Sequence, residues 1–552
     1  MTVKGKATIE AEFGDYQTPA ALADGVCRLL SRRGPPPRSI LEPTCGRGNF
    51  LTAALRRFPS LQAAVGVDIN PDRVREAEDA ARELGASSKI VLMVGDYFKL
   101  DWAAVLDRLP DPLLILGNPP WVTNSAMGSI GGANLPVKTN FRRDRGVDAI
   151  TGKSNFDISE WILLQAVRWM QGRDATLAML CKTAVARKVL LHGWETGAEL
   201  DGCGIYFIDA ARCFGVKAHS CLLVASSRVS RVSRSGSSPA PSAGRGAAPF
   251  LVPGSGSASP ETLVEGCDHH CRQNERPDAP ESPPAVPAGP GCRVHRSLDD
   301  ESCTGIFGPR EGRLIADVSV YERLKHLAGS DGRRWRSGIK HDCSAVMELT
   351  RANGCLKNGL GDVVEIEDDY LYPMSKSSDL RERCTGVSPR YMLVTQRSVG
   401  EDTLGIRQTA PRTWGYLNGH AGLFERRASV VYRNRPPFSV FGVGAYSFAP
   451  WKVAVSGFYK DLHFTAVGPR EGKPVVFDDT CCFLPCQTGE EALRLARLLN
   501  SKTAVDFLGS MIFWDAKRPV TIEILRRLDL GKLATSSDAP DHPLRDPRFS
   551  AP

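Results

Sequence analysis

The sequence predicts an α/β protein with a doubly wound, mostly parallel sheet, followed by a mixed α+β domain. Short apolar runs alternate with helical patterns between residues 39 and 225. Polar or glycine-rich turns follow the first four of these runs. After a tract without apolar periodicity, patterned sequence returns from about residue 310 to about 535. Strand–helix alternation of this length requires a sheet that helices cover on both faces.

Seven apolar runs are the expected strands of the first domain. They are 39–43, 63–70, 89–96, 112–118, 175–182, 203–210 and 218–225. Helical periodicity lies between them, most clearly in 71–85 and 156–170, where Pro71 suits a first helical turn and Gly85 a C-terminal cap. Because only a short segment joins the last two strands, we expect them to pair antiparallel at one edge of a seven-stranded sheet.

A change of composition divides the chain into domains. Its 552 residues exceed one ordinary hydrophobic core, so we expect two domains or more. Residues 226–291 are rich in Ser, Pro, Gly and Arg and hold too little apolar surface to offset the entropy of ordering them. We therefore expect one domain over 1–225, a disordered insertion or linker over 226–300, and a second domain over 301–552.

The overall composition is ordinary for a soluble globular protein, with 42% hydrophobic and 24% charged residues. A net charge of +8 is compatible with a polyanionic partner but does not require one. No run approaches the ~18 apolar residues that cross a bilayer, and the N-terminal MTVKGKATIE has no signal-peptide core. We expect a cytoplasmic protein without membrane contact, whose 16 cysteines are mostly buried thiols.

One group of cysteines has a spacing compatible with zinc. Cys267 and Cys271 form one pair, and Cys292 and His295 form another. The proline-rich tract between the pairs offers no structural frame for a metal. We therefore predict no metal site.

Polar residues follow successive predicted strands at their carboxyl ends, where sheets of this type bind ligands. The first strand continues as LEPTCGRGNFL, whose glycines let the backbone approach a ligand closely. Asp68 ends the second strand, where an acidic residue is placed to accept hydrogen bonds from ribose hydroxyls. After the third strand, Asp96 is placed to accept from an exocyclic amine and Phe98 to flank an adenine ring. Because these turns match neither the dinucleotide fingerprint nor the phosphate loop, they predict a pocket for a nucleoside without a triphosphate, such as S-adenosylmethionine.

The fourth strand ends in the tetrapeptide NPPW, residues 118–121. Asn118 offers a side-chain carbonyl oxygen and Pro119 a backbone carbonyl oxygen. Two acceptors in fixed directions can bind both hydrogens of an exocyclic amine and aim its lone pair at a methyl donor. The locked φ of proline fixes where these carbonyls point. Trp121 adds an aromatic face on which a base can stack.

Together the motifs resemble the gamma-class amino-methyltransferases of bacterial restriction–modification systems, which methylate adenine N6 in DNA. FGDYQTP (13–19) resembles the N-terminal motif of that class, and LEPTCGRGNF, GVDIN and GDYF resemble its cofactor motifs. NPPW resembles the catalytic tetrapeptide, which more often reads NPPY or NPPF. IDAARCFGVKAHSCLLVA (208–225) is similar to the late motif, in which a Phe, here Phe214, contacts the target base. The match keeps the gamma order and covers nearly the whole chain apart from the linker.

The resemblance implies a class I methyltransferase-type fold, S-adenosylmethionine as cofactor and double-stranded DNA as partner, with the target base flipped out of the helix. The implied catalytic residues are Asn118, Pro119, Pro120, Trp121 and Phe214. The residues implied to hold the cofactor are Thr18, Pro19, Glu42, Pro43, Thr44, Cys45, Gly46, Asp68, Ile69, Asp96, Tyr97, Phe98 and Asn118.

The second domain resembles the C-terminal target-recognition domain of the same class. The matching segments are 335–349, 391–396, 445–464, 478–484 and 514–521. They mix Lys and Arg with aromatic and polar side chains, which pair with phosphates and contact base edges. The expected DNA contacts are Lys340, His341, Lys452, Lys460, Lys517 and Arg518.

Several alternative functions stay open. A cytosine N4 target uses the same amine chemistry, and methyltransferases of RNA or of protein glutamine also carry an Asn-Pro-Pro-aromatic tetrapeptide. The large second domain argues against the glutamine enzymes, which are short. A non-catalytic DNA-binding protein with an inactive methyltransferase fold is disfavoured by the intact Asn118 and Asp68. We expect a monomer, with any cognate restriction endonuclease on a separate chain.

Overall fold

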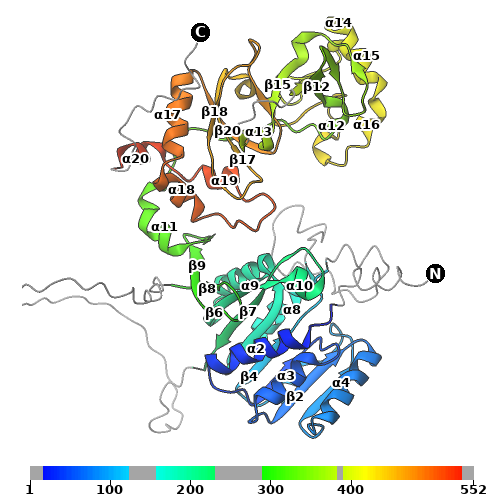
Figure 1. Cartoon of the computed structure of the whole chain (residues 1–552), viewed down its shortest axis with the longest axis vertical. Coiled ribbons are helices and arrows are strands. Elements are labelled where there is room, and N and C mark those ends of the chain that lie inside the picture. The colour runs from blue at the N-terminus through cyan, green and yellow to red at the C-terminus, as the bar shows by residue number, and fades with distance from the viewer. Residues whose placement is uncertain (1–15, 123–156, 230–288, 382–389, 537–552) are drawn as a thin grey trace, which may run out of the picture. The chain divides into compact units, whose positions relative to one another are not determined.

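The computed structural model describes residues 16–122, 157–229, 289–381 and 390–536 (Figure 1). The chain divides into one compact unit, formed by residues 1–228 and 286–552, and a second unit of residues 229–285. Nearly all of the second unit lies outside the described residues. The same is true of most of the expected linker over 226–300.

The N-terminal half contains an α/β sheet with helices on both faces (Figure 1). Its strands are β1 (Ser39–Glu42), β2 (Ala63–Asp68), β3 (Ile90–Val94), β4 (Leu113–Gly117), β5 (Ala175–Lys182), β6 (Asp201–Asp209) and β7 (His219–Ser227). Its helices are α2 (Ala20–Arg33), α3 (Asn49–Arg57), α4 (Pro71–Glu83), α5 (Trp102–Leu106), α8 (Ile158–Met170), α9 (Thr183–Glu195) and α10 (Ala210–Phe214). All seven predicted strands are present, each within two residues of its expected bounds.

These seven strands follow the order β6-β7-β5-β4-β1-β2-β3. The pairings among β1 to β5 are parallel, and β6 and β7 pair antiparallel as the short connection predicts. The carboxyl ends of β1, β2, β3 and β4 therefore meet at one edge of the sheet, where the sequence motifs lie.

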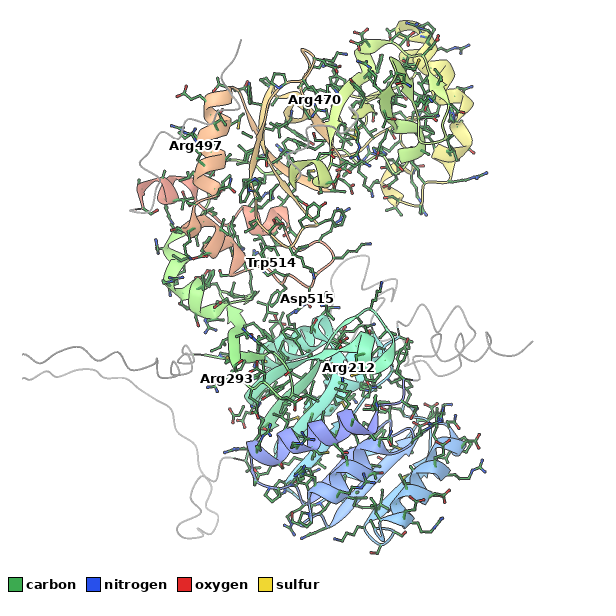
Figure 2. All side chains as sticks on the ribbon, viewed as in Figure 1. Arg212, Arg293, Arg470, Arg497, Trp514 and Asp515 are labelled. Atoms are coloured by element: carbon green, nitrogen blue, oxygen red, sulfur yellow. The ribbon has the colours of Figure 1, made fainter. Side chains whose placement is uncertain are left out.

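We expected seven strands in this sheet, but the sheet continues beyond β6. After the linker, β8 (Cys292–His295) pairs parallel with β6, and β9 (Cys303–Arg310) and β10 (Arg313–Ile315) continue the sheet antiparallel. Arg293, labelled in Figure 2, belongs to β8. The described residues thus form a ten-stranded sheet, and the expected domain start at residue 301 falls inside it. The added strands cover the edge that β6 would otherwise leave unpaired.

The strand β4 shows why its sequence is a continuous apolar run. Leu113 and Ile115 pack in the core on one face of the sheet, whereas Leu114 and Leu116 pack in the core on the other. All four side chains are at most 3% exposed. A strand that is buried on both faces needs apolar residues at every position, not only at alternate ones.

The caps of α4 agree with the sequence signals. Pro71 occupies the first helical position, and the Asn70 side chain accepts a hydrogen bond from the Asp72 amide at 2.9 Å. Just past the helix, Gly85 has a φ of +64°, a left-handed conformation that glycine adopts without strain.

The C-terminal half is mixed α+β and contains two further sheets. A four-stranded sheet has the order β11 (Arg336–Ser337), β20 (Cys481–Cys486), β17 (Trp451–Ser456) and β18 (Thr465–Val467). A six-stranded sheet has the order β14 (Val363–Val364), β13 (Cys355–Lys357), β12 (Glu348–Ala352), β16 (Arg390–Leu393), β15 (Leu371–Ser375) and β19 (Val476–Phe477).

Short helices surround these two sheets (Figure 1). They are α11 (Val318–Leu324), η1 (Lys325–Leu327), α12 (Ser344–Met347), η2 (Asp368–Tyr370), α13 (Ser377–Arg381), α14 (Ile406–Thr409), α15 (Pro411–Gly419), α16 (Ala421–Glu425), η3 (Val430–Tyr432), η4 (Ala445–Phe448), α17 (Gly489–Leu499), α18 (Lys502–Gly509), α19 (Ile522–Leu525) and α20 (Leu530–Thr535). Near the end of the chain, α17 and α18 are separate helices, and the Ser501 hydroxyl caps α18 by accepting from the Ala504 amide.

Most cysteines in the described parts of the chain are buried free thiols, as expected. Among the same residues, no helix has both the length and the apolar character that a membrane crossing needs.

The linker supports a first prediction. Because Ser227 ends β7 and Cys292 begins β8, a deletion confined to residues 232–285 removes no residue of the ten-stranded sheet. The tract's low apolar content leaves little core to lose, so we expect a change in melting temperature of no more than about 4 °C, corresponding to less than about 1 kcal/mol. Differential scanning calorimetry of the deleted and full-length chains measures this, and an unfolded deletion variant would show that the tract is structural.

Candidate cofactor and target-base site

A cavity of about 400 Å³ lies at the carboxyl ends of the central strands. Twelve of the thirteen residues expected to hold the cofactor line it, namely Thr18, Glu42, Pro43, Thr44, Cys45, Gly46, Asp68, Ile69, Asp96, Tyr97, Phe98 and Asn118. Pro19 is not among the lining residues and precedes α2 instead. The lining also contains residues that the sequence analysis did not select, namely Tyr16, Gln17, Asn49, Phe50, Asn70, Gly95, Val122, Ile158 and Ile162.

The turn after β1 forms one wall of the cavity. Glu42 ends the strand and is 2% exposed, and its Oε2 atom has no hydrogen-bond partner among the described residues. Burial raises the pKa of the Glu42 carboxyl well above its ordinary value. Gly46 has a φ of +49°, and a Cβ there would lie 2.4 Å from the Gln17 side-chain oxygen. Glycine at this position therefore lets the segment before α2 close over the turn.

The Asp68 carboxylate at the end of β2 is held by the backbone. One oxygen accepts from the Gly46 amide at 2.8 Å and the other from the Asn70 amide at 2.9 Å. These two bonds link the turns that follow β1 and β2 and fix the direction of the carboxylate.

The turn after β3 brings an acidic residue and two aromatic rings to the cavity. The Asp96 carboxylate accepts from the Phe98 amide at 3.0 Å and pairs with Lys99 at 3.0 Å. The Phe98 ring lies 5.3 Å from the Trp161 ring of α8, centroid to centroid. Burial raises the pKa of Tyr97, whose hydroxyl has no partner within the described residues. The apolar Phe98 ring and the polar Asp96 carboxylate thus line the same cavity.

The segment Tyr16–Thr18 reaches the cavity from the N-terminal side; the FGD that precedes it in the motif lies outside the described residues. Asn49 Nδ2 donates to the Thr18 carbonyl at 2.7 Å, and the Arg47 amide donates to Gln17 Oε1 at 3.1 Å. Two bonds therefore tie this segment to the turn after β1.

Asn118 follows β4, and its side-chain amide has one defined orientation. Nδ2 donates to the Tyr16 carbonyl at 3.1 Å, so Oδ1 is the free end of the amide. This oxygen is buried without a hydrogen-bond partner among the described residues, and Asn118 lines the cavity. A buried acceptor without a donor is unfavourable unless a ligand supplies one.

Three aromatic rings gather beside Asn118. Trp121 and Phe214 lie 5.3 Å apart, centroid to centroid, and Tyr16 lies 6.4 Å from Trp121 and 6.2 Å from Phe214. Phe214 ends α10, the short helix that also carries Arg212 (Figure 2). The structure thus brings together the two predicted aromatics and adds Tyr16, which the sequence motif contained but the analysis left unassigned.

Comparison with known proteins identifies the family, although no family model matches the chain. Over 95% of its length, the chain is 39% identical to the type II methyltransferase M.NspV of Nostoc sp. (strain ATCC 29411 / PCC 7524), and it covers 97% of that protein. The chain belongs to the type II methyltransferases.

Two further similarities are more limited. The type II methyltransferase M.CvrRI of Paramecium bursaria Chlorella virus XZ-6E is 31% identical over 20% of this chain and 26% of that protein. Among solved structures, the type IIL restriction-modification enzyme MmeI in complex with DNA is 11% identical, with a TM-score of 0.45. That match covers 90% of this chain but 63% of MmeI, so the chain spans less than two thirds of that enzyme.

As a type II methyltransferase, the protein is a restriction–modification DNA methyltransferase, and its cofactor is S-adenosylmethionine, as the sequence predicted. The cavity fits this group. Its lining offers buried oxygens on Glu42, Thr44 and Asn118 that have no hydrogen-bond partner in the described parts of the chain, and the Glu42 carboxyl suits the cationic amino group of the cofactor. Asp68 is directed by the backbone, as an acceptor for ribose hydroxyls needs to be.

The six expected DNA contacts divide into exposed and buried side chains. Lys460, Lys517 and Arg518 of the type II methyltransferase are exposed, and Lys340 is partly exposed beside Asp342, with the two charges 2.8 Å apart. His341 is 6% exposed, and its Nε2 lies 3.3 Å from Glu348. Lys452 is 1% exposed and donates to the Ala449 and Val475 carbonyls at 2.6 and 2.9 Å.

The expectation that His341 and Lys452 contact DNA is therefore corrected. A side chain that is almost fully covered and bonded inside its domain does not reach a phosphate or a base edge. Arg518 remains accessible, although it pairs with Asp479 at 3.1 Å and lies 4.8 Å above the Phe458 ring.

The buried Lys452 predicts a pH dependence of stability. Burial lowers the pKa of this lysine from its ordinary value of 10.5 to about 8. Between these values the unfolded chain keeps a proton that the folded chain has released, so the contribution of Lys452 to stability rises with pH. The free energy of unfolding of the wild type, minus that of Lys452→Met, should increase by about 2 kcal/mol from pH 8 to pH 10. Urea titrations at both pH values measure it, and a constant difference would contradict the shift.

Of the four residues with a zinc-like spacing, the structure describes only Cys292 and His295. Cys267 and Cys271 lie outside the described residues. Cys292 and His295 lie on β8 with an odd spacing, so Cys292 packs in the core on one face whereas His295 stacks on Tyr206 at 4.4 Å. Within the described ranges, no three His, Cys, Asp or Glu side chains are grouped so that they could hold a metal ion.

Proposed function

We propose that this type II methyltransferase is a gamma-class enzyme that methylates the exocyclic N6 of adenine in a specific sequence of double-stranded DNA. The observation that supports this most strongly is the orientation of Asn118. Its amide nitrogen donates to the Tyr16 carbonyl, and its oxygen, which has no hydrogen-bond partner among the described residues, belongs to a residue that lines the cofactor cavity.

An adenine amino group is a weak nucleophile, because its lone pair is delocalised into the ring. Asn118 Oδ1 accepts one hydrogen of this group and the Pro119 carbonyl accepts the other, which directs the lone pair away from both oxygens. Bound S-adenosylmethionine would supply an electrophilic methyl group, whose bond to sulfur breaks as the N–C bond forms and leaves S-adenosylhomocysteine. After the new N–C bond forms, the nitrogen loses one proton to solvent, so the residues of the chain need not provide a strong base.

The target base must leave the helix, which costs a few kcal/mol. In this proposal the rings of Trp121 and Phe214, with Tyr16 beside them, stack on the extruded base, and Trp121, which is 7% exposed, becomes accessible as the base enters. Stacking contributes about 1–3 kcal/mol per base and so offsets much of this cost.

The C-terminal half recognises the DNA sequence in this proposal. We assign the exposed Lys460, Lys517 and Arg518 and the partly exposed Lys340 to the DNA backbone. We expect the enzyme to act as a monomer, with a restriction endonuclease, where one accompanies it, as a separate chain.

Sequencing with base-modification detection tests the proposal. DNA is taken from a host that expresses the wild type and from a host that expresses Asn118→Ala. We expect N6-methyladenine at one recurring sequence in the first DNA and none above background in the second. N4-methylcytosine at one sequence would replace adenine as the target, and unmodified DNA from the wild-type host would refute the proposal.

A further inference from the structure

The loop that carries Asn118 is bound by Lys182, which has no role in the reaction chemistry described above. Lys182 ends β5, which pairs with β4 in parallel so that Met179 lies opposite Gly117. The Lys182 side chain therefore starts at the same edge of the sheet as the loop. Its ammonium donates to the backbone carbonyl of Trp121 at 3.0 Å.

The same ammonium is held from the other side by α8. It donates to the Asp157 carboxylate at 2.6 Å, and Asp157 is 7% exposed. The other oxygen of Asp157 accepts from the Ser159 amide at 3.1 Å and from its hydroxyl at 2.6 Å, because Asp157 is the N-cap of α8. The Asp157 carboxylate is thus fixed in position, and Lys182 links it to the Trp121 carbonyl of the loop.

A neighbouring bond supports the loop in the same way. The Ile158 amide at the start of α8 donates to the Val122 carbonyl at 2.9 Å. Two successive carbonyls, those of Trp121 and Val122, are therefore both bound, one by β5 and one by α8. This fixes the peptide planes on the carboxyl side of Trp121 and of Val122, immediately after the NPPW tetrapeptide.

We propose that Lys182 is a positioning residue that holds the 118–121 loop in its methyl-transfer geometry. This inference rests on the proposed function. Lys182 does not line the cavity, and its two bonds are made to the Trp121 carbonyl and to Asp157, so it acts through the backbone of the 118–121 loop and not on the base itself. A shift of about 1 Å in a positioned group lowers the rate of chemistry about 100-fold.

The test compares three variants. Lys182→Met keeps the length of the stem without the charge, and Lys182→Arg keeps a cation that can restore part of the contact. Lys188→Met is a matched control, because Lys188 of α9 pairs with Glu160 of α8 at 3.4 Å and so also links a lysine to a carboxylate of that helix.

The first readout is the single-turnover rate of methyl transfer at saturating DNA and S-adenosylmethionine. We expect Lys182→Met to lower this rate 10- to 100-fold, with the KM for DNA and the Kd for the cofactor changed less than threefold. Lys182→Arg should recover most of the loss, and Lys188→Met should stay within threefold of the wild type. A rate for Lys182→Met within twofold of the wild type would overturn the inference, and so would an equal loss in the Lys188→Met control.

The second readout does not depend on DNA. Hydrogen–deuterium exchange of peptides covering residues 113–122 should be faster in Lys182→Met than in the wild type and unchanged in Lys188→Met. Equal exchange in all three proteins would overturn the inference. If the wild type methylated no DNA, the proposed function would fail, but the exchange experiment would still decide whether Lys182 holds the loop.

Discussion

Asn118→Ala is expected to lower the rate of methyl transfer by at least about 100- to 1000-fold, the cost of removing one preorganised group that stabilises a developing charge. The variant loses the only side-chain oxygen that the loop offers to the amino group, whereas the Pro119 carbonyl remains. It also loses the bond from Nδ2 to the Tyr16 carbonyl, so a small decrease in cofactor affinity is expected. Single-turnover transfer of a tritiated methyl group to DNA measures the rate, and calorimetric titration measures the affinity.

Asn118→Asp is the matched comparison for this prediction. It keeps an oxygen at the same place, so we expect it to retain more activity than Asn118→Ala. Turnover of Asn118→Ala near that of the wild type would remove the amide from the mechanism. A loss of methyl transfer that only follows a comparable loss of cofactor binding would assign Asn118 to the cofactor alone.

Asp68→Ala is expected to weaken binding of S-adenosylmethionine by about 100-fold, the effect of about 3 kcal/mol from lost hydrogen bonds to a charged group. The substitution removes two functions of the Asp68 carboxylate at once. It is the predicted acceptor for the ribose hydroxyls, and it joins the turns after β1 and β2 through the Gly46 and Asn70 amides. Isothermal titration calorimetry with the cofactor measures the change.

Asp72→Ala is the control for this second prediction. Asp72 lies in the first turn of α4, is well exposed and pairs with Arg75 on the surface, so its removal should leave cofactor affinity within about twofold. Equal affinity of Asp68→Ala and the wild type would show that the cofactor does not use the carboxylate at the end of β2.

The strands and the cavity could be predicted because their signals are local. Each apolar run ends in a turn whose polar or glycine residues lie at the carboxyl edge of the sheet, and parallel topology then brings these turns together. Tyr16 was predictable on the same grounds, since it is part of the N-terminal motif, but it binds Asn118 through its backbone carbonyl, which the residue type does not indicate.

Other features depend on contacts between residues that are distant in sequence. The strand β8 has four residues, and β9 contains Gly, Pro and Arg and no regular apolar pattern, so the sequence did not predict that they extend the first sheet. A lysine is rarely buried, and nothing around Lys452 indicated that its ammonium would bond two carbonyls inside the domain. The contact between Lys182 and Trp121 spans 61 residues and has no sequence signal of its own.

Nucleoside mass spectrometry is the most direct test of the central claim, which is that Asn118 and Pro119 present a nucleobase amino group to S-adenosylmethionine. Purified enzyme methylates unmodified DNA with deuterated-methyl cofactor, and the DNA is then digested to nucleosides. We predict deuterated N6-methyladenine as the product. A product carrying the label on a ring carbon, as in 5-methylcytosine, or no labelled nucleoside at all, would contradict the account.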